Sequence, residues 1–186
     1  MLRSITFAEL VVCWFAWMVP FFRVARTSKG HEKVTRAPIA RLGILFQMIS
    51  FALAFSYLGQ MKYPRPAAAL IAAMVLAPLA VLLAWAATLH LGKQWRIDAA
   101  LRSDHELVQT GPYCNIRHPI YTSMLLMLLA ACCAWTRWPL QLVAVPLFLI
   151  GMEIRIHAEE RLLSQRFGDA FTAFRARVPA YVPFVR

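Results

Sequence analysis

Five long apolar stretches follow one another along this chain, and short polar segments separate them. The stretches cover residues 5–22, 39–58, 67–91, 119–135 and 138–156. A helix needs about 20 residues, with a range of about 17–25, to cross the hydrocarbon core of a bilayer. The pattern therefore predicts about five membrane-spanning helices, of which the last two are shorter and form a tight helical hairpin.

The basic residues predict how these helices cross the membrane. Sixteen of the 20 lysine and arginine residues lie in three regions. These are the segment between the first and second stretches with the start of the second, the segment between the third and fourth stretches, and the chain from the end of the fifth stretch onward. The segments on the opposite side carry only Arg3, Lys62, Arg65 and Arg137. Because cytoplasmic loops are enriched in basic residues, we expect the N-terminus outside and the C-terminus in the cytoplasm.

The composition favours a membrane protein over a soluble one. Hydrophobic residues make up 60% and charged residues 16% of the 186 positions, which is outside the range of ordinary soluble domains. The formal net charge of +11 is explained by topology and by attraction to anionic lipid headgroups, so we expect no nucleic-acid partner. The four cysteines lack metal-ligand spacing, and we expect neither a disulfide nor a metal site.

The first polar segment with candidate chemistry runs from residue 90 to residue 121. Pro119 suits the first position of a helix, because its missing N–H would have had no helical partner there. His118 is therefore the expected N-cap of the fourth helix. The free N–H groups of that first turn form a seat for an anion, and Arg117 adds positive charge beside it. The same residues also fit a plain membrane-interface border.

The second polar segment is the end of the fifth apolar stretch. It gathers Glu153, Arg155, His157, Glu159 and Glu160. Charged groups this close to a membrane are costly and mark either function or a buried pair. Arg155 shares a helix face with Glu159, and Glu153 shares one with His157, so intrahelical ion pairs are the alternative explanation. If the two segments face each other, they form a cavity that contains both signs of charge.

The chain beyond Glu160 is an amphipathic tail. Phenylalanines at helical spacing alternate with arginines, and Gly168-Asp169 is expected to divide the tail into two short helices with Asp169 as an N-cap. Such a segment lies in the membrane interface or covers a cavity. The predicted fold class is all-α: an integral membrane bundle of about five transmembrane helices with a C-terminal amphipathic cytoplasmic helical segment.

Several linked motifs of the two polar segments and the tail recur together in one known family. They are His105-Glu106-Leu107-Val108, Gly111-Pro112-Tyr113, Arg117-His118-Pro119-Ile120-Tyr121, Glu159-Glu160, Phe167-Gly168 with Phe171 and Phe174, and Val178-Pro179 with Pro183. In this order they resemble the isoprenylcysteine carboxyl methyltransferase family and its phospholipid-methyltransferase-like relatives. The resemblance divides the chain into N-terminal transmembrane helices in residues 1–88 and a methyltransferase-like catalytic region in residues 89–186.

The resemblance implies a membrane enzyme that uses S-adenosyl-L-methionine, bound on the cytoplasmic side under the C-terminal segment. By position, it implies cofactor-binding roles for His105, Glu106, Leu107, Val108, Tyr113, His118, Pro119, Ile120, Tyr121 and Glu159. Arg155 matches the family's substrate-contacting arginine, so Arg155 and Glu159 are the implied catalytic pair. Gln94 and Asp98 have no assigned counterpart and stay outside the predicted site.

The methyl acceptor remains open at this point. Arg155 suits a substrate carboxylate because a guanidinium offers a planar, two-point grip, and a carboxylate nucleophile needs no general base. A phospholipid amine or another neutral amine would need a base, for which Glu160 and His157 are the candidates.

Two functions compete with a methyltransferase. One is an NADPH-dependent reductase of the sterol type, and the other is a membrane scaffold without enzymatic activity. The paired Glu159-Glu160 favours a cationic cofactor over a phosphorylated nucleotide. The expected partners are membrane lipids and a hydrophobic or lipidated acceptor, and the expected location is a bacterial or archaeal cytoplasmic membrane with the active site facing the cytoplasm.

Overall fold

The computed structural model describes residues 1–27, 34–56, 64–94, 100–102 and 106–181. The elements in chain order are α1 (Leu2–Thr27), β1 (Val34–Arg36), α2 (Ala40–Phe55), α3 (Ala67–Leu91), η1 (Gly92–Gln94), β2 (Ala100–Arg102), η2 (Gly111–Cys114), α4 (Pro119–Ala134), α5 (Trp138–Phe167) and α6 (Asp169–Arg177). Helices dominate, so the all-α prediction is confirmed. The sequence did not predict β1 and β2, which form a short antiparallel pair.

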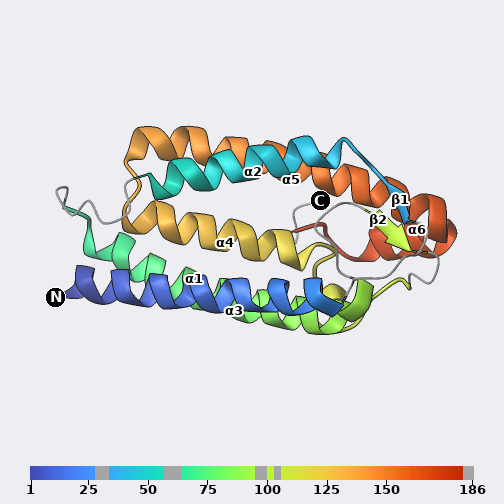
Figure 1. Ribbon diagram of the computed structural model, residues 1–186, viewed down its shortest axis with the longest axis horizontal. Coiled ribbons are helices and arrows are strands. Elements are labelled where there is room, and N and C mark those ends of the chain that lie inside the picture. The colour runs from blue at the N-terminus through green and yellow to red at the C-terminus, as the bar shows by residue number, and fades with distance from the viewer. Residues whose placement is uncertain (28–33, 57–63, 95–99, 103–105, 182–186) are drawn as a thin grey trace.

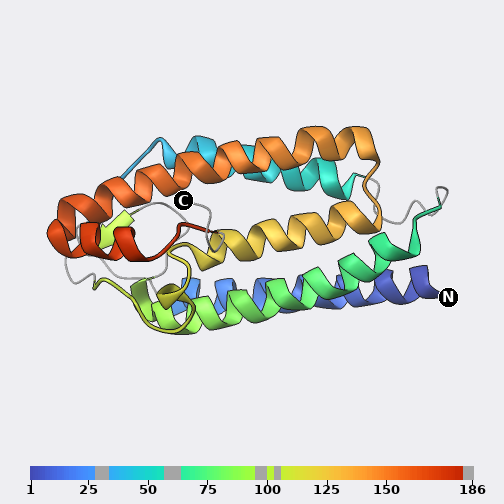
Figure 2. The same cartoon turned by 180° about the vertical axis from the view of Figure 1, so that it is seen from behind.

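The helices α1 to α5 lie side by side along the length of the molecule (Figure 1). α2 packs along α5 on one side, α1 packs along α3 on the other, and α4 lies between them against α3. The view from behind shows the same order (Figure 2). β1, β2 and α6 gather at one end of the bundle, opposite the N-terminus. The two polar segments predicted from the sequence therefore lie at the same end.

Three helical segments of the described chain are long and apolar enough to cross a membrane: Leu2–Arg23, Ala67–Leu91 and Trp138–Phe167. α2 and α4 are apolar but shorter, with 16 residues each, or about 24 Å at the usual helical rise. Large apolar side chains cover the outer faces. Phe15, Met48, Leu82 and Leu142 are each more than three-fifths exposed. Such extensive apolar exposure is typical of a surface in contact with lipid.

Most predicted helix bounds agree with the structure. α3 spans the predicted residues 67–91, and α4 begins at Pro119 with His118 as its N-cap. Both outcomes follow from strong local signals, namely a long apolar run and a proline at the first helical position. The end of the second predicted stretch, residues 57–58, lies outside the described residues.

The prediction for the end of the fifth helix was wrong. α5 does not stop at residue 156 but continues to Phe167, so the first of the two short tail helices is part of α5. Only α6 is separate. The break falls at Gly168, whose φ of 50° lies in the left-handed region that glycine adopts easily. Gly168, not Asp169, is the N-cap of α6, and Asp169 lies in its first turn.

α2 and α5 approach each other most closely at two glycines. A Cβ atom on Gly43 would lie 2.5 Å from the carbonyl oxygen of Gly151, and one on Gly151 would lie 2.7 Å from that of Gly43. Real Cβ atoms essentially never come this close. Small residues at a helix crossing let membrane helices pack backbone against backbone. The crossing holds α2 beside the charged end of α5.

Candidate functional site

A cavity of about 710 Å³ extends from the 106–121 segment and α6 into the bundle between α1, α2, α4 and α5. Its size falls within the range of about 300–1,000 Å³ that is usual for small-molecule sites. We call the part lined by Glu106, Tyr113, His118, Tyr121 and Glu159 the polar half. We call the part lined by Trp14, Trp17, Met18, Ile44, Met48, Phe51 and Met124 the apolar half. Arg155 and Gln47 also line the cavity.

The structure brings the predicted site residues together around this cavity. The lining includes Glu106, Leu107, Val108, Tyr113, His118, Pro119, Ile120, Tyr121, Arg155 and Glu159. His105 and Asp98 lie outside the described residues. Two segments that are about 40 residues apart in the chain therefore meet at one end of the bundle. What each residue binds stays a prediction.

Glu159 presents its carboxylate to the cavity. The Tyr121 hydroxyl donates a hydrogen bond to Glu159 Oε1, and His118 Nδ1 lies 3.5 Å from Glu159 Oε2. The His118 and Tyr121 rings stack with their centroids 5.8 Å apart. The Glu159 side chain keeps 27% exposure. The carboxylate is thus held in a fixed position while part of it remains accessible to a ligand.

Glu160, the next residue, faces away from the cavity and into a salt bridge. Arg117 Nη2 donates to Glu160 Oε1 at 2.8 Å and Arg117 Nε donates to the same oxygen at 3.0 Å. Both side chains are about 95% buried. Glu160 does not line the cavity. Arg117 also lines the cavity, but its charge is paired with Glu160, so the expectation that it strengthens a positive field for an anion stays a prediction.

Arg117 also fastens the C-terminal segment 175–181, which we call the roof. Its Nη1 donates to the carbonyls of Arg175, at 3.0 Å, and Val178. Its backbone N–H donates to the carbonyl of Pro179 at 2.9 Å, and the N–H of His118 donates to that of Ala180 at 2.8 Å. The roof thus lies against the start of α4, and α6, which leads into it, lines the cavity with Phe171 and Phe174.

Burial and ion pairing change the protonation of two groups in the polar half. Burial alone lowers the pKa of His118, but its hydrogen bonds to Glu159 and Glu160 outweigh burial, and the net pKa is raised. Burial raises the pKa of the Tyr113 hydroxyl, and the Glu159 charge raises it further. Tyr113 therefore stays a neutral hydrogen-bond donor, and His118 favours its cationic form.

Arg155 is buried on α5, one turn deeper in the bundle than Glu159. Its Nη1 donates to Gln47 Oε1 on α2 at 2.8 Å, and its guanidinium lies 4.7 Å from the centre of the Tyr121 ring. It is 7% exposed. Contacts from two other helices therefore fix the direction of the guanidinium at the point where the polar and apolar halves meet.

The two candidate bases do not face the cavity. His157 Nδ1 lies 3.3 Å from Glu153 Oε2, which is the predicted intrahelical pair, and its side chain is 65% exposed. Both residues line a separate groove on the outer side of α5. Because Glu160 is engaged by Arg117 and His118, neither candidate is placed to take a proton from a substrate in the cavity.

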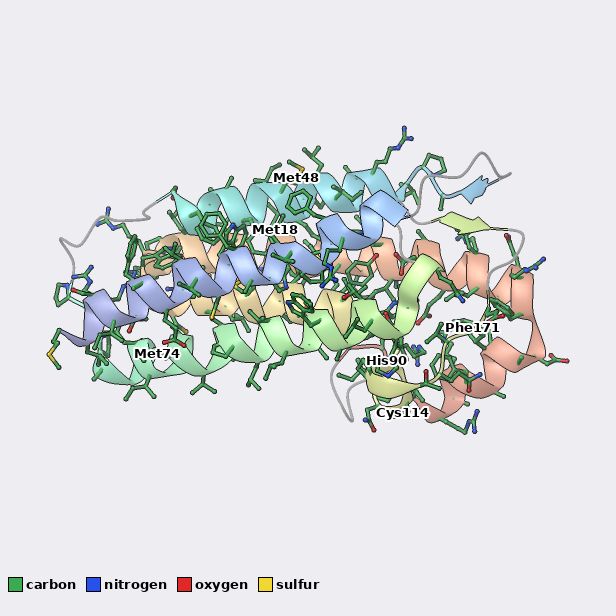
Figure 3. All side chains as sticks on the ribbon, turned by 60° about the horizontal axis from the view of Figure 1, so that its bottom comes forward. Met18, Met48, Met74, His90, Cys114 and Phe171 are labelled. Carbon is green, nitrogen blue, oxygen red and sulfur yellow. The ribbon has the colours of Figure 1, made fainter. Side chains whose placement is uncertain are left out.

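Several lining residues were missed from the sequence. Gln94 lines the cavity although it was left out, and Trp17, Gln47 and Phe51 contribute from the two N-terminal helices. Figure 3 shows Met18 and Met48 on the neighbouring helices α1 and α2, and Phe171 at the end that carries α6. A signal was available for Gln47, because an amide inside an apolar stretch is costly unless it has a role.

The apolar outer faces and the charged cavity together define a helical membrane protein with a cavity that is polar at one end and apolar at the other. The family model of the isoprenylcysteine carboxyl methyltransferase (ICMT) family matches residues 70–165, just over half of the chain. The chain therefore belongs to this family, and it is a multi-pass membrane methyltransferase that uses S-adenosyl-L-methionine. No curated protein matches the chain. The reductase and scaffold interpretations are not retained.

Proposed function

We propose that this cavity is the active site of a carboxyl methyltransferase that acts on an isoprenylcysteine-like lipid acid. One observation carries the proposal: Glu159 and Arg155, of opposite charge and one turn apart on α5, line the same cavity. A carboxylate suits a cationic methyl donor, and a guanidinium suits an anionic acceptor. The two charges therefore assign one end of the cavity to each reactant.

The residues of the polar half fit S-adenosyl-L-methionine chemically. Glu159 balances its positive charge, and the free N–H groups of Ile120 and Tyr121 at the start of α4 suit its carboxylate. Leu107, Leu163 and Phe174 add apolar lining for the adenine ring. When bound, this cofactor supplies an activated methyl group, and its transfer to a carboxylate yields a methyl ester without release of a proton.

The protein's contribution is then orientation and exclusion of water. Arg155 holds the acceptor carboxylate in one direction, because Gln47 and Tyr121 fix the guanidinium. Backbone hydrogen bonds from Arg117 and His118 to the roof hold the end of α6, whose Phe171 and Phe174 line the cavity. Correct placement of two reactants supplies a large part of a rate enhancement. A neutral amine acceptor is disfavoured, since neither His157 nor Glu160 lines the cavity.

The apolar half suits the hydrocarbon chain of the acceptor. It reaches the surface between α1 and α2, where the lining residues Phe22 and Met48 are 61% and 65% exposed. Trp14, Trp17 and Phe51 line it farther inside the bundle. A lipid chain therefore has a path from the bilayer into the cavity that keeps it in apolar surroundings throughout.

We further propose five transmembrane helices with the active site at the cytoplasmic face. The 16-residue α2 and α4 lie alongside the three long helices, and the end that carries α6 is the end with most of the basic residues. Labelling of single cysteines introduced at Lys62 and Arg175 tests this topology. Modification of both sites from the same side of a sealed membrane excludes it.

The function is tested with detergent-purified protein. Isothermal titration with S-adenosylhomocysteine should show binding, and titration with NADPH should show none. Radiolabelled methyl transfer should then be measured to N-acetyl-S-farnesyl-L-cysteine and, separately, to phosphatidylethanolamine. Base-labile methyl ester on the farnesyl acid is the expected product. Labelling of the phospholipid alone would instead establish an amine methyltransferase.

A further inference from the structure

Gln47 is a polar side chain at membrane depth that the family match does not include. It lies on α2, outside residues 70–165, it is 2% exposed, and it lines the cavity. Its neighbours along α2 that also line the cavity are Ile44, Met48 and Phe51, all apolar. A buried amide in such surroundings is costly unless both of its polar atoms have partners.

One half of the amide has a partner, and the other half does not. Gln47 Oε1 accepts from Arg155 Nη1 at 2.8 Å. Among the described residues, Gln47 Nε2 is shielded from solvent and has no hydrogen-bond partner. The orientation of the amide is not ambiguous, because a guanidinium can only donate. The opposite orientation would set N–H against N–H. The Nε2 atom therefore presents its hydrogens away from the point of contact with Arg155.

The crossing of α2 and α5 holds this amide in place. A Cβ atom on Gly43 would lie 2.6 Å from Arg155 Cγ, so the arginine stem packs directly over Gly43. Gln47 lies one turn farther along α2 and bonds the guanidinium itself. α2 thus contacts Arg155 along its stem and at its head. The close approach at Gly43 and Gly151 is what puts Gln47 within reach.

We propose that Gln47 is a second binding residue for the methyl acceptor, and that its Nε2–H donates to the same carboxylate that Arg155 holds. The proposal rests on the proposed function and deepens it. Both groups at this point of the cavity offer only donors to a ligand, because the amide oxygen is occupied by Arg155. Such a pair matches a carboxylate and repels an ammonium. Gln47 therefore selects an acid as acceptor over an amine.

Two substitutions at this position test the proposal. Gln47→Met removes both polar atoms with little change of volume. Gln47→Glu keeps the side-chain shape and an oxygen that accepts from Arg155, so this variant should fold even if Gln47→Met does not. It removes the Nε2–H donor, and its carboxylate neutralises the Arg155 guanidinium. Both variants should raise the KM for N-acetyl-S-farnesyl-L-cysteine by about tenfold or more, which corresponds to the loss of one charge-assisted hydrogen bond. Gln47→Glu should have the larger effect.

The controls separate binding from stability. The Kd for S-adenosylhomocysteine should stay within about twofold of wild type in both variants. Loss of a single hydrogen bond to this ligand would raise the Kd by more than that. Gln141→Met removes a half-buried amide that bonds the carbonyls of Cys132 and Thr136 at the far end of the bundle, and the KM of this variant should not change. An unchanged acceptor KM in Gln47→Glu overturns the proposal and leaves the proposed function standing. Failure of the wild type to esterify any acid overturns the proposed function itself.

Discussion

The two halves of the cavity are built by different physical means. In and directly behind the polar half, buried charges engage one another: Arg117 bonds Glu160, His118 lies between Glu159 and Glu160, and Tyr121 donates to Glu159. The apolar half is bounded by rings and thioethers from α1, α2 and α4. The polar half thus depends on particular atoms at particular distances, whereas the apolar half depends on shape and volume.

This difference predicts how each half responds to change. An interlocked set of charges fails when one member is lost, because the remaining charges are left buried without a partner. An apolar wall tolerates substitution and changes only which ligands fit, since a methylene group is worth only about 1–3 kcal/mol in discrimination. Cofactor affinity should therefore fall sharply when a single polar atom of the polar half is removed. The preference among acceptors should change only by small steps when the apolar half is substituted.

The largest effect is expected at Arg155, where the two halves meet. Arg155→Lys keeps the charge but loses the planar grip and the contacts with Gln47 and Tyr121. Turnover of a carboxyl acceptor should fall at least about a hundredfold, because small displacements from the reactive geometry are costly. Affinity for S-adenosylhomocysteine should stay near wild type. The exposed Arg161, changed to lysine, is the matched control. Turnover close to wild type in Arg155→Lys would remove Arg155 from the acceptor site.

The next effect separates two adjacent carboxylates on α5, of which only Glu159 lines the cavity. Glu159→Gln should weaken S-adenosylhomocysteine binding by about 1.5–3 kcal/mol, roughly tenfold or more, because a charge-assisted contact is lost. Glu160→Gln should instead lower thermal stability, since Arg117 loses its buried partner. Titration calorimetry and thermal unfolding distinguish the two outcomes. Equal and small effects on binding from both substitutions would mean that Glu159 has no part in holding the cofactor.

A smaller effect concerns pH and follows from the raised pKa of His118. The folded protein holds the His118 proton more tightly than the unfolded chain does, so protonation of His118 stabilises the fold. This stabilisation is complete at pH values below 6.5, the ordinary histidine pKa, and is lost as the pH rises through the pKa of His118 in the folded protein. The slope is at most about 1.4 kcal/mol per pH unit. Thermal unfolding between pH 6 and 9, roughly the window above the ordinary histidine pKa, measures it. His118→Gln should flatten this slope, and His157→Gln, at an exposed histidine, should leave it unchanged. If the slope survives in His118→Gln, the pH dependence comes from another group.

The smallest effect lies in the apolar half. The Trp14 ring lies 4.6 Å from Phe55 and 5.3 Å from Trp17, centre to centre, and it lines the cavity. Trp14→Ala should lengthen the apolar half and raise kcat/KM for a geranylgeranyl acid relative to the farnesyl acid by about fivefold, or roughly 1 kcal/mol. The exposed Trp138→Ala is the control. An unchanged ratio would show that the chain does not reach Trp14.

Much of this architecture could be predicted from local sequence signals. The apolar run of residues 67–91 and Pro119 at the start of α4 gave helix bounds that the structure repeats. The charges at Arg155 and Glu159 could be recognised because ionised groups are rare so close to a membrane. These signals involve residues within one or two helical turns of each other, so they can be recognised in the sequence alone.

Other features depend on contacts that local patterns do not contain. Glu159 and Glu160 are adjacent, and which one faces the cavity depends on the rotation of α5 against α4. Arg117 bonds backbone carbonyls about 60 residues later in the chain, a pairing that no spacing rule predicts. The end of α5 was placed too early, because the boundary at the membrane surface was taken as the end of the helix.

The roof also determines when the site is completed during biosynthesis. Chains emerge N-terminus first and their parts fold in that order, and residues 175–181 follow the helices α1 to α5. The backbone N–H groups of Arg117 and His118 obtain their partners only when Pro179 and Ala180 arrive. A nascent chain with helices α1 to α5 in place still lacks α6, which lines the cavity with Phe171 and Phe174. Under the proposed function, cofactor binding is therefore expected only after α6 has been synthesised and the roof has docked against α4.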